Sequence, residues 1–169
     1  ASYCCFYLLN MVVLVLVLWV RRCFRSSSDT RLKTATPRHK APTFTGFKHT
    51  LRDGTRILVR TSEDISGQAR DRKVMLLAAP LGQCGPWIYN PIMAWYGPEY
   101  LYITWDYRGF FDSETAPTHR LRNLSIHEHA RDGMEVLQAC GFPRADCVVG
   151  HSMGTAVALE MSLLFPEAV

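Results

Sequence analysis

An α/β fold with a mostly parallel sheet is the architecture that this 169-residue chain predicts. Two short, continuous apolar runs have the composition of strands buried on both faces. After an initial strand pair, strand and helix patterns alternate three times, which is typical of parallel strands joined by right-handed crossovers. A third observation lies outside this domain, because the N-terminal stretch is apolar enough to cross a membrane.

Five strands are predicted, and the first two form a hairpin. Asp53-Gly54 is a strong hairpin signal because both residues tolerate the backbone conformation of a tight turn. The strands are expected at 44–51, 55–61, 73–79, 100–105 and 146–149. The third and fourth are the continuous apolar runs, rich in branched and aromatic residues.

Three helices are expected after the last three strands, at 87–96, 126–140 and 154–165. Pro91 predicts either a first turn or a break in the first helix. Ser125 and Glu128 have the spacing of a capping box and open the second helix, which Gly141 ends.

The N-terminal apolar segment spans residues 3–20, and Asn10 is its one strongly polar member. A helix of that length extends roughly 27 Å, close to the thickness of a hydrocarbon core. The alternative is a cleaved signal peptide, which needs a basic stretch before the apolar run and small residues at a cleavage site after it. Here the basic residues come after the run, beginning at Arg21. We therefore predict an uncleaved, single-pass transmembrane anchor over residues 1–22.

Charge divides the rest of the chain into a basic neck and a mildly acidic domain. Residues 21–60 carry eleven Lys or Arg and two Asp, whereas residues 61–169 carry eight basic and thirteen acidic residues. This pattern does not indicate nucleic-acid binding. We predict a linker at 23–42 whose cations contact anionic lipid headgroups, while a solvated linker remains compatible. Basic residues stay on the cytoplasmic side, so the folded domain is expected in the cytosol.

The cysteines show no metal-binding spacing such as C-x-x-C. A disulfide framework is not expected either, because a domain of this size can bury its own core. Those near the apolar segment could be acylated or could simply face lipid. We expect neither a metal nor a cofactor. The six residues are Cys4, Cys5, Cys23, Cys84, Cys140 and Cys147.

The sequence Gly150-His151-Ser152-Met153-Gly154 is a G-x-S-x-G motif. It lies between a strand and an apolar helix, which is the setting that a nucleophile elbow requires. At so tight a bend, side chains at the two glycine positions would collide, and Ser152 would be strained with its hydroxyl exposed. The helix N-terminus and the Met153 N–H would favour negative charge on a reacting oxygen. A serine in a glycine-rich helix cap is the alternative.

Over about residues 44–169 the chain resembles the α/β-hydrolase superfamily, and within it the AB-hydrolase-1 type enzymes. The elbow is one of three matching patterns. Residues 106–113 resemble the family's D-x-R-G-x-G-x-S loop, and Leu81-Gly82-Gln83 stands where the family places its oxyanion loop. The resemblance implies a partial α/β-hydrolase fold at 43–169, incomplete at its C-terminus. It also implies that Leu81 supplies the second oxyanion N–H.

Two departures from the family pattern carry expectations of their own. Ala79-Pro80 stands where the family has His-Gly, and proline has no N–H to donate. The N–H donor is the next residue, Leu81, so the oxyanion hole can still form. Phe111 and Asp112 occupy the usual glycine region, which suggests a shift of one residue in register. Asp106 and Arg108 are expected to pair with each other and fix this loop.

The function that the resemblance implies is a membrane-anchored serine hydrolase acting on ester or thioester substrates, with a lipid acyl chain as one option. A Ser nucleophile argues against the dehalogenase and epoxide-hydrolase branches, whose nucleophile is an Asp. In this fold the acid and the His follow the Ser in chain order, so both are expected beyond Val169. Two alternatives remain: an inactive, truncated hydrolase serving as a binding or scaffold module, and a soluble hydrolase whose apolar segment comes from a misjoined exon.

The histidines present are not expected to act as the base. The triplet at 127–129 lacks zinc spacing, and His151, next to Ser152, is on the wrong side of the elbow to reach its hydroxyl. A surface or half-buried position is predicted for four histidines: His119, His127, His129 and His151.

Overall fold

The computed structural model describes residues 37–65, 72–115 and 124–169. The predicted anchor, most of the predicted linker with its three cysteines, and His119 lie outside these ranges. Among the helices within them, none is long and apolar enough to cross a membrane. Residues 37–169 form one compact unit.

One mixed sheet holds five strands in the order β1-β2-β4-β3-β5. Their bounds are β1 (Thr45–Thr50), β2 (Arg56–Thr61), β3 (Lys73–Ala78), β4 (Tyr100–Trp105) and β5 (Cys147–Gly150). β3 runs parallel to both β4 and β5, whereas β2 is antiparallel to both β1 and β4. The prediction of a mostly parallel sheet is therefore corrected to a mixed one, because the hairpin adds to the edge of β4.

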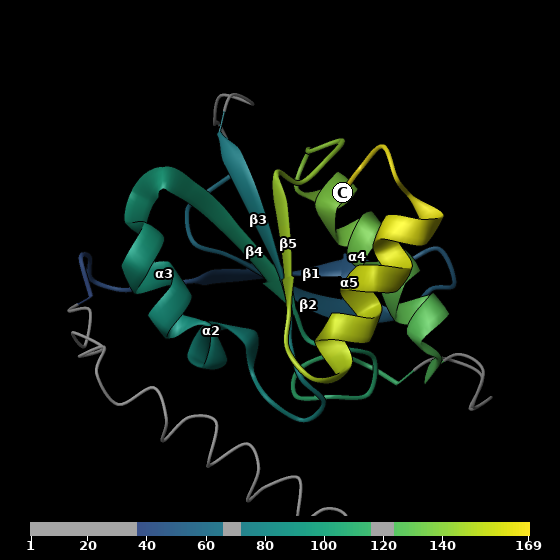
Figure 1. The fold of residues 1–169 in the computed structure, drawn as a ribbon. Helices are drawn as coiled ribbons and strands as arrows, with labels where there is room; N and C mark the ends of the chain where they lie inside the picture. The colour runs from purple at the N-terminus through teal and green to yellow at the C-terminus, as the bar shows by residue number, and fades with distance from the viewer. Residues whose placement is uncertain (1–36, 66–71, 116–123) are drawn as a thin grey trace, which may run out of the picture. The chain divides into compact units, whose positions relative to one another are not determined.

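Helices cover both faces of this sheet (Figure 1). On one face lie α2 (Gly85–Ile88) and α3 (Asn90–Tyr96), followed by the 3-10 turn η1 (Gly97–Glu99). On the other face lie α4 (Ile126–Ala139) and α5 (Met153–Leu164). The single helix expected at 87–96 is divided at Tyr89, and Pro91 lies in the first turn of α3.

Two local signals are confirmed at atomic level. The Ser125 hydroxyl accepts a hydrogen bond from the Glu128 N–H at 3.2 Å, which caps α4 as the capping box predicted. Gly54 has a φ of 86° in the β1–β2 turn, a conformation that favours glycine. These short-range features were readable from sequence because they depend on neighbouring residues only.

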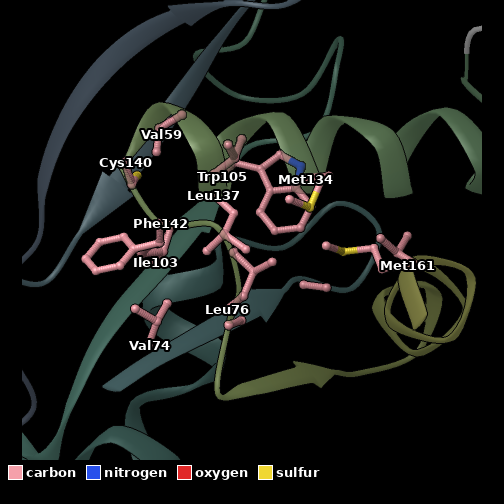
Figure 2. Close-up of a cluster of buried hydrophobic side chains, with 14 of the residues drawn as sticks. Val59, Val74, Leu76, Ile103, Trp105, Met134, Leu137, Cys140, Phe142 and Met161 are labelled. Atoms are coloured by element: carbon pink, nitrogen blue, oxygen red, sulfur yellow. The ribbon is translucent and has the colours of Figure 1, made fainter. Parts of the chain in front are cut away.

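Alternate residues of β3 enter two separate hydrophobic cores. Val74 and Leu76 pack into the cluster beneath α4 and α5, which Figure 2 shows with Met134 and Met161. Met75 and Leu77 pack into the cluster beneath α2 and α3. Because side chains alternate along a strand, a strand covered on both faces must be apolar throughout.

The chain enters this domain along α3. The His39 N–H donates to the Ala94 carbonyl oxygen at 2.9 Å, and the Arg38 guanidinium lies 4.4 Å from the ring centroid of Trp95. The last part of the predicted linker, from residue 37 onward, therefore packs against a helix.

Candidate active site

The bend between β5 and α5 places a non-glycine residue in a strained backbone conformation. Ser152 follows β5 by two residues and has φ 54° and ψ −121°, and α5 begins at the next residue. Among the described non-glycine residues, only Phe111 shares a positive φ. Such a conformation costs on the order of 1–3 kcal/mol and persists only where the surroundings impose it.

Two glycines make this bend possible, as the steric expectation required. A Cβ atom on Gly150 would overlap the Gly154 carbonyl group, and a Cβ atom on Gly154 would overlap the Ala78 carbonyl oxygen. The first turn of α5 therefore packs directly on the C-terminal end of β3. The elbow and the segment leading to Leu81 consequently share one end of the sheet.

The Ser152 side chain is exposed at this bend. It makes no capping hydrogen bond to α5. The neighbouring Thr155 hydroxyl instead donates to the Gly150 carbonyl oxygen at 3.1 Å. Met153 is the first residue of α5, so its N–H has no intrahelical partner and is available as a donor at the N-terminal end of the helix. A serine hydroxyl and a helix terminus that favours negative charge thus adjoin each other.

The turn at Pro80–Gln83 begins two residues after the end of β3. The Gln83 N–H donates to the Pro80 carbonyl oxygen at 3.3 Å, and Gly82 has a φ of 69°. Leu81, the predicted second oxyanion donor, lies in this turn and is 56% exposed. Because Ala78 pairs with Gly150 in the sheet, this turn and the elbow leave adjacent strands at the same level.

The loop after β4 differs from the expected ion pairing. Asp106 pairs with Arg60 of β2. Arg108 binds both carboxylate oxygens of Asp132 in α4, at 2.5 and 2.6 Å, and also pairs with Asp53 in the hairpin turn. The predicted pair between Asp106 and Arg108 is therefore wrong, although both residues are buried and structural. Each side chain reaches a partner that only the fold brings near.

Phe111 explains how the same loop departs from the family pattern. Its φ of 48° is the left-handed conformation for which glycine is favoured. Ser113 closes the loop by donating to the Asp106 carbonyl oxygen at 2.7 Å. A phenylalanine has thus taken a glycine conformation at its own position, and the expected shift in register is not needed to account for the loop.

The histidines of the described chain make no hydrogen bond to Ser152. His151 is exposed, and His127 lies 2.9 Å from a Glu160 carboxylate oxygen across α4 and α5. His129 is 2% exposed, which corrects the prediction of a surface or half-buried position. Burial, with the nearby Arg108 charge, lowers the pKa of His129 to about 4. It is held neutral inside the fold and does not reach the bend.

No metal-binding cluster occurs among the described residues, and the three cysteines within them are free. A cavity of about 220 Å³ lies between the C-terminal end of α5 and the second half of α4, where Arg131, Met134 and Phe165 line it. It contains none of the predicted site residues.

Sequence reasoning missed two tyrosines at this end of the sheet. The Tyr89 hydroxyl donates to the Ala78 carbonyl oxygen at 2.5 Å, and the Tyr107 hydroxyl donates to the Ala79 carbonyl oxygen at 2.8 Å. Nothing in the local sequence distinguishes them from core aromatic residues. Their roles depend on contacts between segments 11 and 28 residues apart.

Comparison with known proteins bears directly on this architecture. A sequence model of the alpha/beta hydrolase fold matches residues 94–169, which include β4, β5 and the elbow. Solved structures match more of the chain, with TM-scores near 0.6. This domain has an α/β-hydrolase fold.

Three structures illustrate the range of α/β-hydrolase proteins that the chain is similar to. A proposed acyltransferase from Salmonella enterica is 25% identical with a TM-score of 0.61, and the match covers 80% of this chain and 42% of that one. A proposed epoxide hydrolase from Pseudomonas aeruginosa is 25% identical with a TM-score of 0.60, covering 77% and 40%. An N-acyl homoserine lactonase is 25% identical with a TM-score of 0.61, covering 74% and 42%. The chain thus spans about two fifths of the length of these α/β-hydrolase structures.

Proposed function

We propose that this protein is a serine hydrolase of the α/β-hydrolase superfamily that cleaves ester or thioester bonds. One observation carries the proposal: an exposed Ser152 with a φ of 54° at a strand-to-helix bend. A backbone that stores strain at a single exposed hydroxyl is typical of a nucleophile elbow.

In this proposal the Ser152 oxygen attacks the substrate carbonyl carbon. The carbonyl oxygen gains negative charge, which the N–H groups of Leu81 and Met153 stabilise by hydrogen bonding. A histidine supplied beyond Val169 takes the hydroxyl proton and returns it to the leaving group, and an acidic residue orients that histidine. Water then releases the acyl group from Ser152.

The three similar structures are named for different reactions: acyl transfer, epoxide hydrolysis and lactone hydrolysis. For this chain we choose among these reactions by the chemistry of the nucleophile. A Ser oxygen attacks carbonyl carbons, which supports acyl chemistry, either hydrolysis or transfer to another acceptor. Opening of an epoxide in this superfamily employs an Asp nucleophile, and no Asp stands at the elbow of this chain.

Labelling by a fluorophosphonate probe tests the nucleophile. The protein encoded up to the natural stop codon should be labelled, and Ser152→Ala should abolish the labelling. Ser162→Ala is the matched control, because Ser162 lies on the same helix with its hydroxyl bonded to the Leu159 carbonyl oxygen at 2.7 Å. Labelling that survives Ser152→Ala would place the nucleophile elsewhere.

An inactive binding or scaffold module is the second candidate. In support of it, no described histidine bonds to Ser152, and an unassisted serine hydroxyl is a poor nucleophile. The transcript beyond Val169 separates the two candidates. Codons for a strand followed by an acid, and later for a histidine loop, support the enzyme, whereas an immediate stop supports the module.

We also propose that the apolar segment at 1–22 anchors the protein in a membrane, with the basic neck against anionic headgroups and the catalytic domain in the cytosol. The apolar composition of this segment and the cations that follow it support the proposal. Deletion of residues 1–22 should move the protein from the membrane pellet to the supernatant after fractionation. A full-length protein recovered in the supernatant would contradict the anchor.

A further inference from the structure

Two consecutive carbonyl groups just before the Leu81 turn are held by tyrosine hydroxyls from different parts of the fold. Tyr89 Oη lies 2.5 Å from the Ala78 oxygen, and Tyr107 Oη lies 2.8 Å from the Ala79 oxygen. Both side chains are buried, at 3% exposure each. A buried hydroxyl that loses its partner is left unsatisfied, so each bond constrains both of its ends.

Tyr89 also reaches toward the strand that carries the elbow. It stands between α2 and α3, and its hydroxyl oxygen lies 3.5 Å from the Val149 carbonyl oxygen in β5. Burial raises the pKa of Tyr89 to about 12, opposed in part by the backbone of His151. The hydroxyl therefore stays protonated and lies between the ends of β3 and β5.

Tyr107 approaches the same segment from the opposite core. Its ring is packed between Trp105, at a centroid distance of 5.6 Å, and His129, at 4.7 Å. A ring fixed on two sides leaves its hydroxyl little freedom. The position of the Ala79 carbonyl group is consequently coupled to β4 and α4.

The segment that receives these bonds has few other supports. β3 ends at Ala78, and Pro80 has no N–H with which to continue a ladder. Gly154 packs against the Ala78 carbonyl from the elbow side, as its missing Cβ requires. The two hydroxyls thus add side-chain hydrogen bonds to the Ala78–Gly150 strand pairing and the Gln83–Pro80 turn bond where the chain leaves β3 toward Leu81.

We propose that Tyr89 and Tyr107 are positioning residues that hold the Ala78 and Ala79 carbonyl groups so that the Leu81 N–H keeps one direction relative to the Ser152 oxygen. This inference rests on the proposed serine-hydrolase function. Both hydroxyls bond to backbone oxygens, so the two tyrosines act through the backbone of the turn. Without them the donor would sample several directions, and transition-state stabilisation would fall while substrate binding remained.

Steady-state hydrolysis of p-nitrophenyl butyrate by the protein up to its natural stop codon provides the first test. Tyr89→Phe and Tyr107→Phe should each lower kcat by about tenfold to a hundredfold with KM changed less than about twofold, since loss of an oxyanion donor itself costs about 100- to 1,000-fold. The affinity for a trifluoromethyl ketone, which forms a tetrahedral adduct on the serine, should fall by the same factor as kcat.

Tyr102→Phe is the matched control. Tyr102 is buried at 1% exposure, and its hydroxyl donates to the Gly97 carbonyl oxygen at 2.8 Å, away from the Leu81 turn. The Tyr102→Phe variant loses an equivalent hydrogen bond and should keep kcat within about twofold of the parent value. Equal kcat values for all three variants and the parent would overturn the positioning role, as would losses confined to KM.

Deuterium exchange over residues 81–84 gives a readout that does not depend on turnover. Exchange should become at least about tenfold faster in Tyr89→Phe and Tyr107→Phe and stay unchanged in Tyr102→Phe. Unchanged exchange in the first two variants also overturns the inference. Failure of the unmutated protein to react with a fluorophosphonate refutes the proposed function instead, so the two failures are distinguishable.

Discussion

Ser152 is the residue where stability and the proposed activity oppose each other. Its φ of 54° and ψ of −121° lie in a region that glycine enters without a steric penalty. The fold keeps a serine there at a cost on the order of 1–3 kcal/mol. Such a cost is understandable where the hydroxyl itself is needed.

Ser152→Gly should therefore raise the free energy of unfolding by about 1 kcal/mol while abolishing fluorophosphonate labelling. Ser162→Gly, in the regular part of α5, should change stability in the opposite direction by about 0.5 kcal/mol. Urea denaturation of the two variants checks the signs. A Ser152→Gly protein less stable than its parent would show that the bend is not strained.

His129 makes stability depend on pH. Its pKa is lowered to about 4, chiefly by burial and then by the Arg108 charge, although the Asp132 carboxylate lies 4.0 Å away. The unfolded chain therefore binds the proton more tightly than the native one. The contribution of neutral His129 to the free energy of unfolding is complete above about pH 6.5. It is lost as the pH falls toward 4, by at most about 3 kcal/mol.

His129→Gln should flatten the decline of unfolding free energy between pH 6.5 and 4. Denaturation of the parent protein and the variant at several pH values across this interval measures both slopes. Identical slopes for the parent and His129→Gln would show that other groups cause the decline.

At the scale of elements, β3 and α5 meet without any side chain between them. Gly154 lies against the Ala78 carbonyl group, and β3 pairs with β5 as far as Gly150. The helix can begin immediately beneath the bend only because this contact is backbone to backbone. The position of the elbow relative to the Leu81 turn follows from it.

Gly154→Ala should destabilise the domain by more than about 3 kcal/mol, since the methyl group would meet a carbonyl oxygen that cannot move aside. Gly141→Ala is the control, because a Cβ there meets nothing within 4 Å and only its φ of 86° is strained. That variant should cost about 1 kcal/mol. Thermal melts that rank the two in the reverse order would contradict the close contact.

At the scale of the whole domain, Arg108 joins three separate segments. It lies in the loop after β4 and pairs with Asp53 in the hairpin turn and Asp132 in α4. Both Arg108 and Asp132 are 1% exposed, so neither charge has water as a partner. Removal of the arginine leaves the buried Asp132 carboxylate without its two direct hydrogen bonds and with the partly exposed Arg52 guanidinium 3.6 Å away.

Arg108→Ala should cost about 3–5 kcal/mol of unfolding free energy. Arg56→Ala removes a half-exposed pair with Glu114 at 3.7 Å and should cost less than about 1 kcal/mol. Chemical denaturation of both variants makes the comparison. A small effect for Arg108→Ala would mean that the domain does not depend on this junction.

From the sequence alone it was possible to predict the five strands, the helices α4 and α5, the hairpin turn, the α4 cap and the position of the strand-to-helix bend. Each depends on steric fit or side-chain alternation within a few residues, so local patterns suffice. Only the tertiary structure decided that β2 pairs with β4, that Arg108 binds Asp132, and that two tyrosine hydroxyls hold the segment before Leu81. Those partners are 11 to 46 residues apart along the chain, and packing of the two cores on the sheet brings them together.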